Sequence, residues 1–164
     1  MHNGQELHTV QKRTYGGRVT QQTSRRQLNR AATRQAIISA SIDAVLVQGR
    51  DNVTVDQIAE ASGISRRTFF NYFSSIDAAL NAPTESVLAN ARRHLDERPV
   101  DEPLIETVLQ VISTNVTVQY LRQCLALWQH LDASPEFLRY ELQVWDAAER
   151  DFVDALQRRF GPEV

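Results

Sequence analysis

The sequence predicts an all-α protein, and three observations support this class. Two short segments between residues 54 and 73 each begin with a capping residue and a pair of flanking apolar side chains. From about residue 84 onward, apolar residues recur at helical spacing, and prolines or glycines separate the repeats. The β-branched segment VISTNVTVQY has helical stripes on both sides and no evident partner strand, so we expect helix there, interrupted near Asn115.

Residues 54–73, TVDQIAEASGISRRTFFNYF, predict two short helices joined by a glycine turn. Thr54 and Gln57 have the spacing of a capping box at the start of the first helix. Gly63 suits the end of that helix, and Ser65 can cap the second one a few residues later. The segment is therefore interpreted as a helix-turn-helix.

The second helix of this pair has the side chains expected of a surface that binds nucleic acid. It carries hydrogen-bond donors and flat rings at Arg66, Arg67, Thr68, Phe70, Asn71 and Tyr72. No carboxylate occurs between Glu60 and Asp77, and a helix that lies against phosphates should exclude negative charge. We expect Phe69 and Phe73 to be buried and the polar side chains to face the partner.

The chain here resembles the amino-terminal domain of TetR-family transcriptional regulators. The likeness is carried by TVDQIAEASGISRRTFFNYFSSIDAAL and the preceding TRQAIISASIDAVLVQG, and it covers about residues 30–80. It implies a DNA-binding transcriptional regulator, in particular a repressor released by a small-molecule effector, that acts as a homodimer on a palindromic operator. The DNA-binding residues that it implies are Thr54, Ser65, Arg66, Arg67, Thr68, Phe70, Asn71 and Tyr72.

Within this set, the resemblance implies that Thr54 and Tyr72 hold the phosphate backbone. The chain departs from the family pattern at Ile76, where the family usually has a lysine that meets a phosphate. We therefore expect one backbone contact to be lost or moved. Phe70 lacks the hydroxyl common at its position, so it would offer thymine methyl groups an apolar contact.

The first 23 residues are polar and without periodicity, which predicts a disordered arm. The positive charges of the first 34 residues oppose only Glu6, and they are Lys12, Arg13, Arg18, Arg25, Arg26, Arg30 and Arg34. The arm either follows DNA phosphates or is a solvated tail. Ser24 and Gln27 then predict a helix over residues 25–48. Its buried face should comprise Ile38, Ser41, Ile42 and Val45.

The sequence predicts a boundary between a DNA-binding domain at residues 24–82 and a helical domain at residues 83–164. Ser74 or Ser75 can cap a short fourth helix that Pro83 should end, and Thr84 can cap the next helix. Further breaks at prolines 99 and 103 and at proline 135 separate the remaining apolar stripes. We expect the second domain to bind the effector and to dimerise.

The expected effector pocket lies among aromatic side chains of this second domain, although for any single one of them a role in core packing is the stronger interpretation. Its candidate lining residues are Tyr120, Cys124, Trp128, Phe137 and Trp145, with Arg122 or Glu141 as polar anchors. The last helix carries a stripe at Leu138, Leu142, Trp145, Phe152 and Leu156. Family members have about two further long helices, so we expect a domain without its last helices that associates weakly or aggregates through residues 138–156.

Composition argues against several other classes of protein. Residues 1–82 hold 10 Lys/Arg against 6 Asp/Glu, and residues 83–164 hold 8 against 14, so the charges are +4 and −6. One cysteine, no signal-peptide pattern and no membrane-spanning stretch predict a cytoplasmic protein. His94 and His130 lack partners at metal-ligand spacing, and we expect no metal, no cofactor and no catalysis. The alternative is a helical adaptor that binds a protein through residues 66–72, and salt dependence would distinguish it from a DNA-binding protein.

Overall fold

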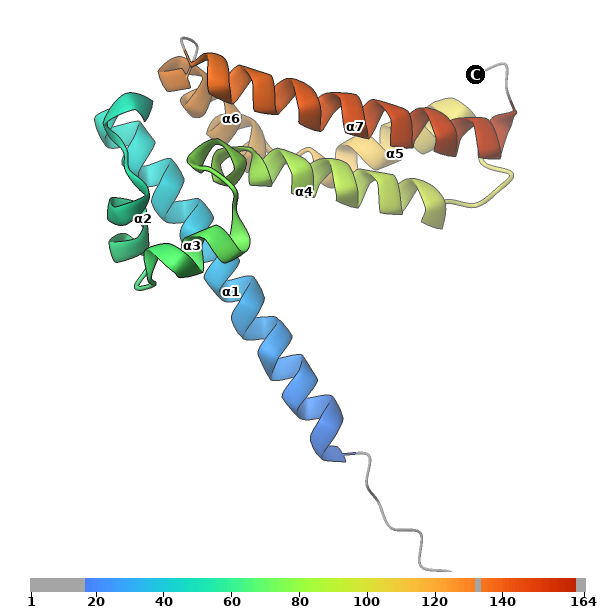
Figure 1. The fold of residues 1–164 in the computed structure, drawn as a ribbon. Coiled ribbons are helices and arrows are strands. Elements are labelled where there is room, and N and C mark those ends of the chain that lie inside the picture. The colour runs from blue at the N-terminus through green and yellow to red at the C-terminus, as the bar shows by residue number, and fades with distance from the viewer. Residues whose placement is uncertain (1–16, 132–133, 162–164) are drawn as a thin grey trace, which may run out of the picture. The chain divides into compact units, whose positions relative to one another are not determined.

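The computed structural model describes residues 17–131 and 134–161, and all regular elements within them are helices (Figure 1). They are α1 (Gly17–Gln48), the 3-10 turn η1 (Arg50–Asn52), α2 (Val55–Ala61), α3 (Arg66–Tyr72), α4 (Ile76–Glu97), α5 (Leu104–Asn115), α6 (Val118–Leu131) and α7 (Pro135–Phe160). The predicted all-α class is thereby confirmed. No helix in these ranges is long and apolar enough to cross a membrane. The chain divides into two units between Thr33 and Arg34, which are described separately.

The first unit contains the amino-terminal part of α1. This helix begins at Gly17, eight residues before the expected start at Arg25, so the predicted cap at Ser24 is wrong and part of the expected arm is helical. Residues 17–24 carry no apolar periodicity, so no helix is predicted there from the sequence. Once a helix is nucleated, each added residue gains a backbone hydrogen bond without needing an apolar face. Residues 1–16 of the arm lie outside the described part of the chain.

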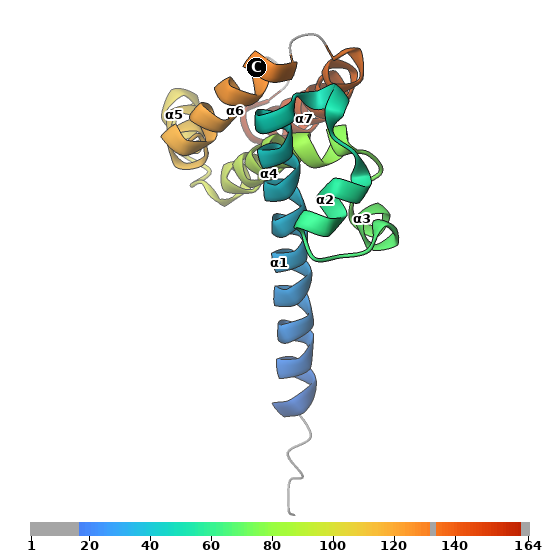
Figure 2. The ribbon, with the colours of Figure 1, turned by 90° about the vertical axis from the view of Figure 1, so that its left-hand side faces the viewer.

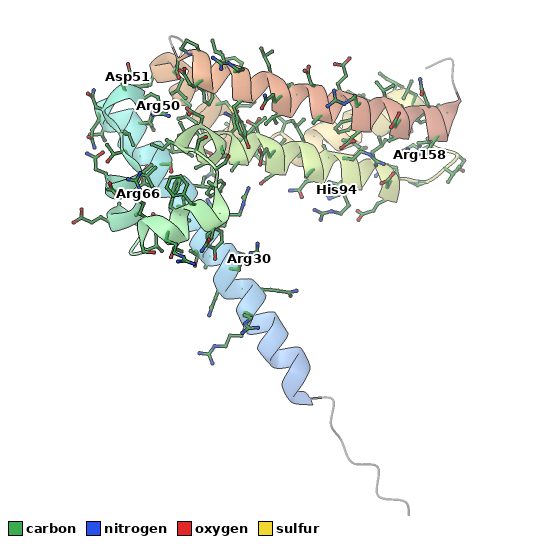
Figure 3. All side chains as sticks on the ribbon, viewed as in Figure 1. Arg30, Arg50, Asp51, Arg66, His94 and Arg158 are labelled. Carbon is green, nitrogen blue, oxygen red and sulfur yellow. The ribbon has the colours of Figure 1, made fainter. Side chains whose placement is uncertain are left out.

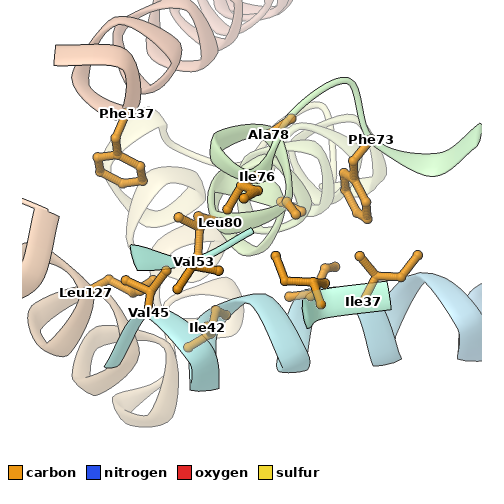
Figure 4. Close-up of a cluster of buried hydrophobic side chains, with 14 of the residues drawn as sticks. Ile37, Ile42, Val45, Val53, Phe73, Ile76, Ala78, Leu80, Leu127 and Phe137 are labelled. Atoms are coloured by element: carbon orange, nitrogen blue, oxygen red, sulfur yellow. The ribbon is translucent and has the colours of Figure 1, made fainter. Parts of the chain in front are cut away.

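In the second unit, one hydrophobic core joins the helix-turn-helix to the helices that follow it. The predicted face of α1 is buried, with Ile38, Ser41, Ile42 and Val45 each at most 4% exposed. Figure 4 shows side chains of α1, α4, α6 and α7 in this same cluster, among them Leu127 and Phe137. Apolar packing therefore continues across the boundary that the sequence predicted at residue 82.

Helix α4 also runs through that boundary, so the predicted break at Pro83 is wrong. Proline removes one backbone hydrogen bond inside a helix and costs about 3 kcal/mol there. The side chains around it offset this cost because they are buried, as Leu80 at 2% and Ala82 at 0% exposure show. Ser75 caps the helix, accepting a hydrogen bond from the Ala78 amide at 3.0 Å.

A second, smaller core lies where α4 and α7 run side by side (Figures 1 and 2). Its buried members are Ala91, Leu95, Val111 and Ala155, and Phe152 and Leu156 pack against it. The predicted interruption near Asn115 is confirmed, since α5 ends at that residue and α6 begins at Val118. Arg159 of α7 binds the carboxyl end of α4 by donating to the carbonyls of Leu95 (3.2 Å) and Arg98 (2.9 Å).

Much of the apolar surface predicted on the later helices is exposed. The α7 stripe divides: Phe152 and Leu156 pack in the second core, whereas Leu142 is 64% and Trp145 48% exposed. The other apolar side chains that α5, α6 and α7 expose are Ile105, Leu109, Ile112, Val118, Leu121, Leu125, Trp128, Leu138 and Val153. Exposed apolar surface on this scale is typical of an interaction surface.

A buried ion pair connects the turn after α1 to the first turn of α4. Arg50 donates from Nε and Nη2 to the two carboxylate oxygens of Asp77, at 2.8 and 2.7 Å. Asp77 is 5% exposed. The hydrogen bonds to Asp77 raise the pKa of Arg50 above its ordinary value, so the guanidinium stays charged.

We predict that Arg50→Ala lowers the free energy of unfolding by about 3–5 kcal/mol, because it leaves the Asp77 carboxylate buried without its partner. Asp56→Ala is the matched control, since it breaks an Asp–Arg pair whose side chains are 68% and 59% exposed. That change should cost under about 1 kcal/mol. Urea denaturation of both variants measures the difference, and equal losses would contradict a structural role for the buried pair.

Candidate nucleic-acid interface

The predicted capping box at the start of α2 is present. The Thr54 amide donates to Gln57 Oε1 at 2.8 Å, and the Gln57 amide donates to Thr54 Oγ1 at 3.4 Å. Val53 and Ile58, the apolar pair on either side of this cap, are 5% and 0% exposed. The hydrogen bonds and the apolar pair together fix where α2 begins and how the chain enters it.

The turn between α2 and α3 has a Schellman-type helix end. The Ile64 amide donates to the Ala59 carbonyl at 2.9 Å, and the Gly63 amide donates to the Glu60 carbonyl at 3.0 Å. Gly63 has a φ of 65°, which a residue with a Cβ adopts only at a cost. The glycine thus stops α2 and lets the chain re-enter a helix at Arg66.

Helix α3 is anchored by its cap and by two phenylalanines. The Thr68 amide donates to Ser65 Oγ at 3.1 Å, as predicted. Phe69 and Phe73 are buried, at 0% and 6% exposure, and this expectation is also confirmed. Phe70, in contrast, is 47% exposed and meets the Phe69 ring edge-on, with 5.4 Å between ring centroids.

The exposed side of α3 carries the predicted donors, but they differ in whether they already bind another side chain of the protein. Arg67 and Asn71 lie one turn apart and opposite the buried phenylalanines, and both are exposed. Arg66 is exposed too, yet it donates to Asp56 of α2 at 2.8 Å and lies 5.6 Å from the Phe70 ring centroid (Figure 3). The outward pair is thus available to a ligand, whereas Arg66 would first have to leave Asp56.

The remaining predicted contact residues lie around this pair. Thr54 and Ser65 are exposed at the amino ends of α2 and α3, and Thr68 is half-buried with its hydroxyl 2.8 Å from Ser65 Oγ. Tyr72 is half-buried against the core. Ile76 is 6% exposed at the start of α4, where it packs in the core. A side chain so placed offers phosphate no hydrogen bond, and the expected loss of one contact stays a prediction.

The basic arm is only partly described. Arg25, Arg26 and Arg30 are exposed on α1 within the first unit. Arg18 lies in the helix, and Lys12 and Arg13 lie outside the described residues. Arg34 belongs to the second unit, where it contacts Phe73 and Glu85, and its position in the sequence alone did not indicate this role.

Four of the five predicted effector residues are divided between two hollows of the second unit. An apolar cavity of about 450 Å³ lies among α4, α5, α6 and α7, and Tyr120 and Trp145 line it. A second hollow of about 430 Å³ is lined by Trp128, Phe137 and Glu141. Cys124 and Arg122 line neither of these two, so the five predicted residues do not form one wall.

Tyr120 and Cys124 stay protonated at neutral pH. Burial raises the pKa of Tyr120 to about 12, and its hydroxyl lies 3.2 Å from Thr84 Oγ1, to which it donates. Burial also raises the pKa of Cys124, which is the opposite of what an activated thiol nucleophile requires. Among the described residues, no group of three or more histidine, cysteine, aspartate or glutamate side chains could hold a metal ion.

The fold and the exposed face of α3 together define an all-α helix-turn-helix protein. Residues 37–82 match the family model of bacterial regulatory proteins, tetR family. The HTH-type transcriptional regulator TcmR of Streptomyces glaucescens is 34% identical over 77 residues, which make up 47% of this chain and 34% of that relative. The helix-turn-helix region of this chain is thus similar to that of TetR-family regulators, and the chain spans about a third of the length of the curated relative that it matches.

Two solved structures share the fold. One is a transcription regulator from Shewanella sp. PV-4 assigned to the tetR family, with a TM-score of 0.52 and 17% identity over 77% of this chain and 69% of that one. The other is a transcriptional regulator from Pseudomonas aeruginosa PAO1, with a TM-score of 0.52 and 20% identity over 79% of this chain and 65% of that one. These likenesses confirm a helix-turn-helix domain followed by a helical domain.

The adjacent phenylalanines of α3 should respond oppositely to truncation. Phe69→Ala empties a fully buried site and should lower the free energy of unfolding by about 3–5 kcal/mol. Phe70→Ala removes a side chain that is 47% exposed and should change stability far less, which makes it the matched control. Thermal or urea denaturation checks both, and a large loss for Phe70→Ala would mean that its ring is part of the core.

Proposed function

We propose that this chain is a DNA-binding transcriptional regulator that represses its target genes until a small-molecule effector releases it. The observation that carries the proposal is the outward face of α3, where Arg67 and Asn71 are exposed beside the apolar ring of Phe70. Arginine binds guanine or phosphate, and asparagine binds adenine. The stretch from Ala61 to Ile76 contains no carboxylate that would repel DNA.

The proposed arrangement on DNA places α3 in the major groove. Thr54 and Ser65, at the amino ends of α2 and α3, would meet phosphates, and Tyr72 would do so from the other end of α3. Arg66 would exchange Asp56 for a phosphate or a base edge. The basic arm, of which Arg25, Arg26 and Arg30 are described and exposed, would add further phosphate contacts.

The proposed active form is a homodimer in the cytoplasm, in which two copies read the halves of a palindrome. Two recognition helices must then lie about 34–36 Å apart. The exposed apolar side chains of α5, α6 and α7 support self-association, because stable monomers rarely expose so much apolar surface. No catalytic step and no bound cofactor form part of this proposal.

Selection of bound fragments from random DNA tests the proposal directly. A palindromic consensus whose half-sites lie one helical turn apart would support both DNA binding and the dimer. Binding should weaken steeply between about 50 and 200 mM salt, since released counterions drive association with DNA. A failure to select any sequence, together with salt-independent capture of a protein by residues 66–72, would favour the adaptor alternative.

We predict that Arg67→Ala weakens binding to the selected operator by about 1–3 kcal/mol. If Arg67 reads a base, the loss should be confined to that operator, and if it meets phosphate the loss should be similar on unrelated DNA. Arg93→Ala is the matched control, because this exposed arginine lies on α4 outside the helix-turn-helix. Titration with labelled duplexes at fixed salt measures the change, and unaltered binding of Arg67→Ala to both duplexes would refute its role.

The effector is proposed to bind in the apolar cavity lined by Tyr120 and Trp145. Screening apolar metabolites for thermal stabilisation should identify a ligand, and a concentration of 100 times its Kd should stabilise the chain by about 2.7 kcal/mol. Trp145→Ala should abolish that stabilisation. Trp128→Ala, which alters the other hollow, should leave it intact. The reverse result would place the effector against Trp128 and Phe137.

A further inference from the structure

A continuous series of side-chain contacts connects α7 to the carboxyl end of α3, the proposed recognition helix. The Tyr140 hydroxyl of α7 donates to Glu85 Oε1 of α4 at 3.1 Å. The other oxygen of Glu85 lies 3.8 Å from Arg34 Nη2 of α1. The Arg34 guanidinium lies over the ring of Phe73, 5.1 Å from its centroid, and Phe73 is the carboxy-terminal cap of α3.

Thermodynamic stability alone does not account for this arrangement. The side chains of Arg34 and Glu85 are each 37% exposed, and ion pairs of this exposure add little to the stability of a fold. The arrangement instead determines the position of the Glu85 carboxylate, because side chains of both α1 and α7 contact it. Burial, and then the neighbouring Glu85, raise the pKa of Tyr140, so its hydroxyl stays a donor at neutral pH.

The place of Glu85 in α4 is also informative. It lies two residues after Pro83, where the helix lacks one backbone hydrogen bond and bends more readily. Its neighbour Thr84 accepts a hydrogen bond from Tyr120 of α6 at 3.2 Å. Two tyrosines from different helices thus hold α4 at adjacent residues.

The two tyrosine contacts differ in what lies beyond them. From Tyr140, contacts continue through Glu85 and Arg34 to α3. Within the described ranges 17–131 and 134–161, no hydrogen bond or ion pair continues from Thr84 toward α3. Loss of the Tyr120 contact is therefore a control for loss of the Tyr140 contact, because only the Tyr140 contact is connected to α3.

We propose that Arg34 and Glu85 are positioning residues through which Tyr140 of α7 fixes the carboxyl end of the recognition helix. A movement of α7 that withdraws the tyrosine hydroxyl releases Glu85, and Arg34 then no longer holds Phe73 in place. The expected loss of DNA affinity rests on the proposed function. The expected loss of order in α3 does not depend on that function.

Amide hydrogen exchange of the full chain tests the positioning without DNA. Tyr140→Phe should accelerate exchange across Arg66–Phe73 by about fivefold, the lower end of coupling between distant sites. Tyr120→Phe removes the equivalent hydroxyl contact to α4 and should leave exchange in α3 unchanged. Equal acceleration by both variants, or none by Tyr140→Phe, would overturn the inference.

A double-variant cycle separates a connected series from independent losses. Arg34→Gln should accelerate exchange in α3 as Tyr140→Phe does, and adding Tyr140→Phe to it should change little more. Fully additive effects would mean that the two side chains act independently and would overturn the inference.

Binding to the selected operator provides the functional readout. Tyr140→Phe should weaken it by about fivefold with the salt dependence unchanged, because no phosphate contact is lost. Asn90→Ala is the control for binding, because it removes only an exposed hydrogen bond from Arg93 elsewhere on α4, and it should bind as the unaltered chain does. If no operator can be selected, the proposed function fails while the exchange result still decides the positioning. If an operator is found and Tyr140→Phe binds it as tightly as the unaltered chain does, the inference fails alone.

Discussion

The buried ion pair between Arg50 and Asp77 holds together the two ends of the segment that contains the helix-turn-helix. Arg50 begins the turn after α1, and Asp77 lies in the first turn of α4, 27 residues later. The two parallel hydrogen bonds fix the orientation of the guanidinium as well as its position. A carboxylate in the first turn of a helix is also favoured by the helix dipole. Everything between these residues, including α2 and α3, is a loop whose closure the pair stabilises.

Helix α4 carries this constraint into the rest of the molecule. Its first turns lie in the larger core with Ile76 and Leu80, and its later turns supply Ala91 and Leu95 to the second core. Because the helix continues through Pro83, the two cores share one continuous helix. A movement of the carboxy-terminal helices that displaces α4 therefore also displaces the part of α4 that packs against the helix-turn-helix, because α4 is not interrupted by a linker.

The sequence predicted those features that depend on residues three or four positions apart. The caps at Thr54 and Ser65 and the break at Pro135 predicted the starts of α2, α3 and α7 at the residues where the structure has them. Features that depend on distant residues were missed. The Arg50–Asp77 pair and the Arg34 contacts join residues 27 or more positions apart, and the burial that keeps α4 intact across Pro83 is a property of the folded core. The split of the expected pocket is likewise a property of tertiary packing, because one hollow lies among α4, α5, α6 and α7 and the other between α6 and α7.

Helix α3 shows how structural contacts and outward-facing side chains are divided among few residues. Helix α3 has seven residues, far fewer than the roughly 12–15 that an isolated helix needs to be stable in water. Its order must come from its surroundings, and the residues that supply it can be named: Ser65 caps it, Phe69 and Phe73 bury one side, and Arg66 binds Asp56. The side chains left without such a role are Arg67 and Asn71, which lie beside the half-exposed ring of Phe70. A surface that recognises DNA requires side chains of this kind, held by a rigid helix but not themselves consumed in holding it.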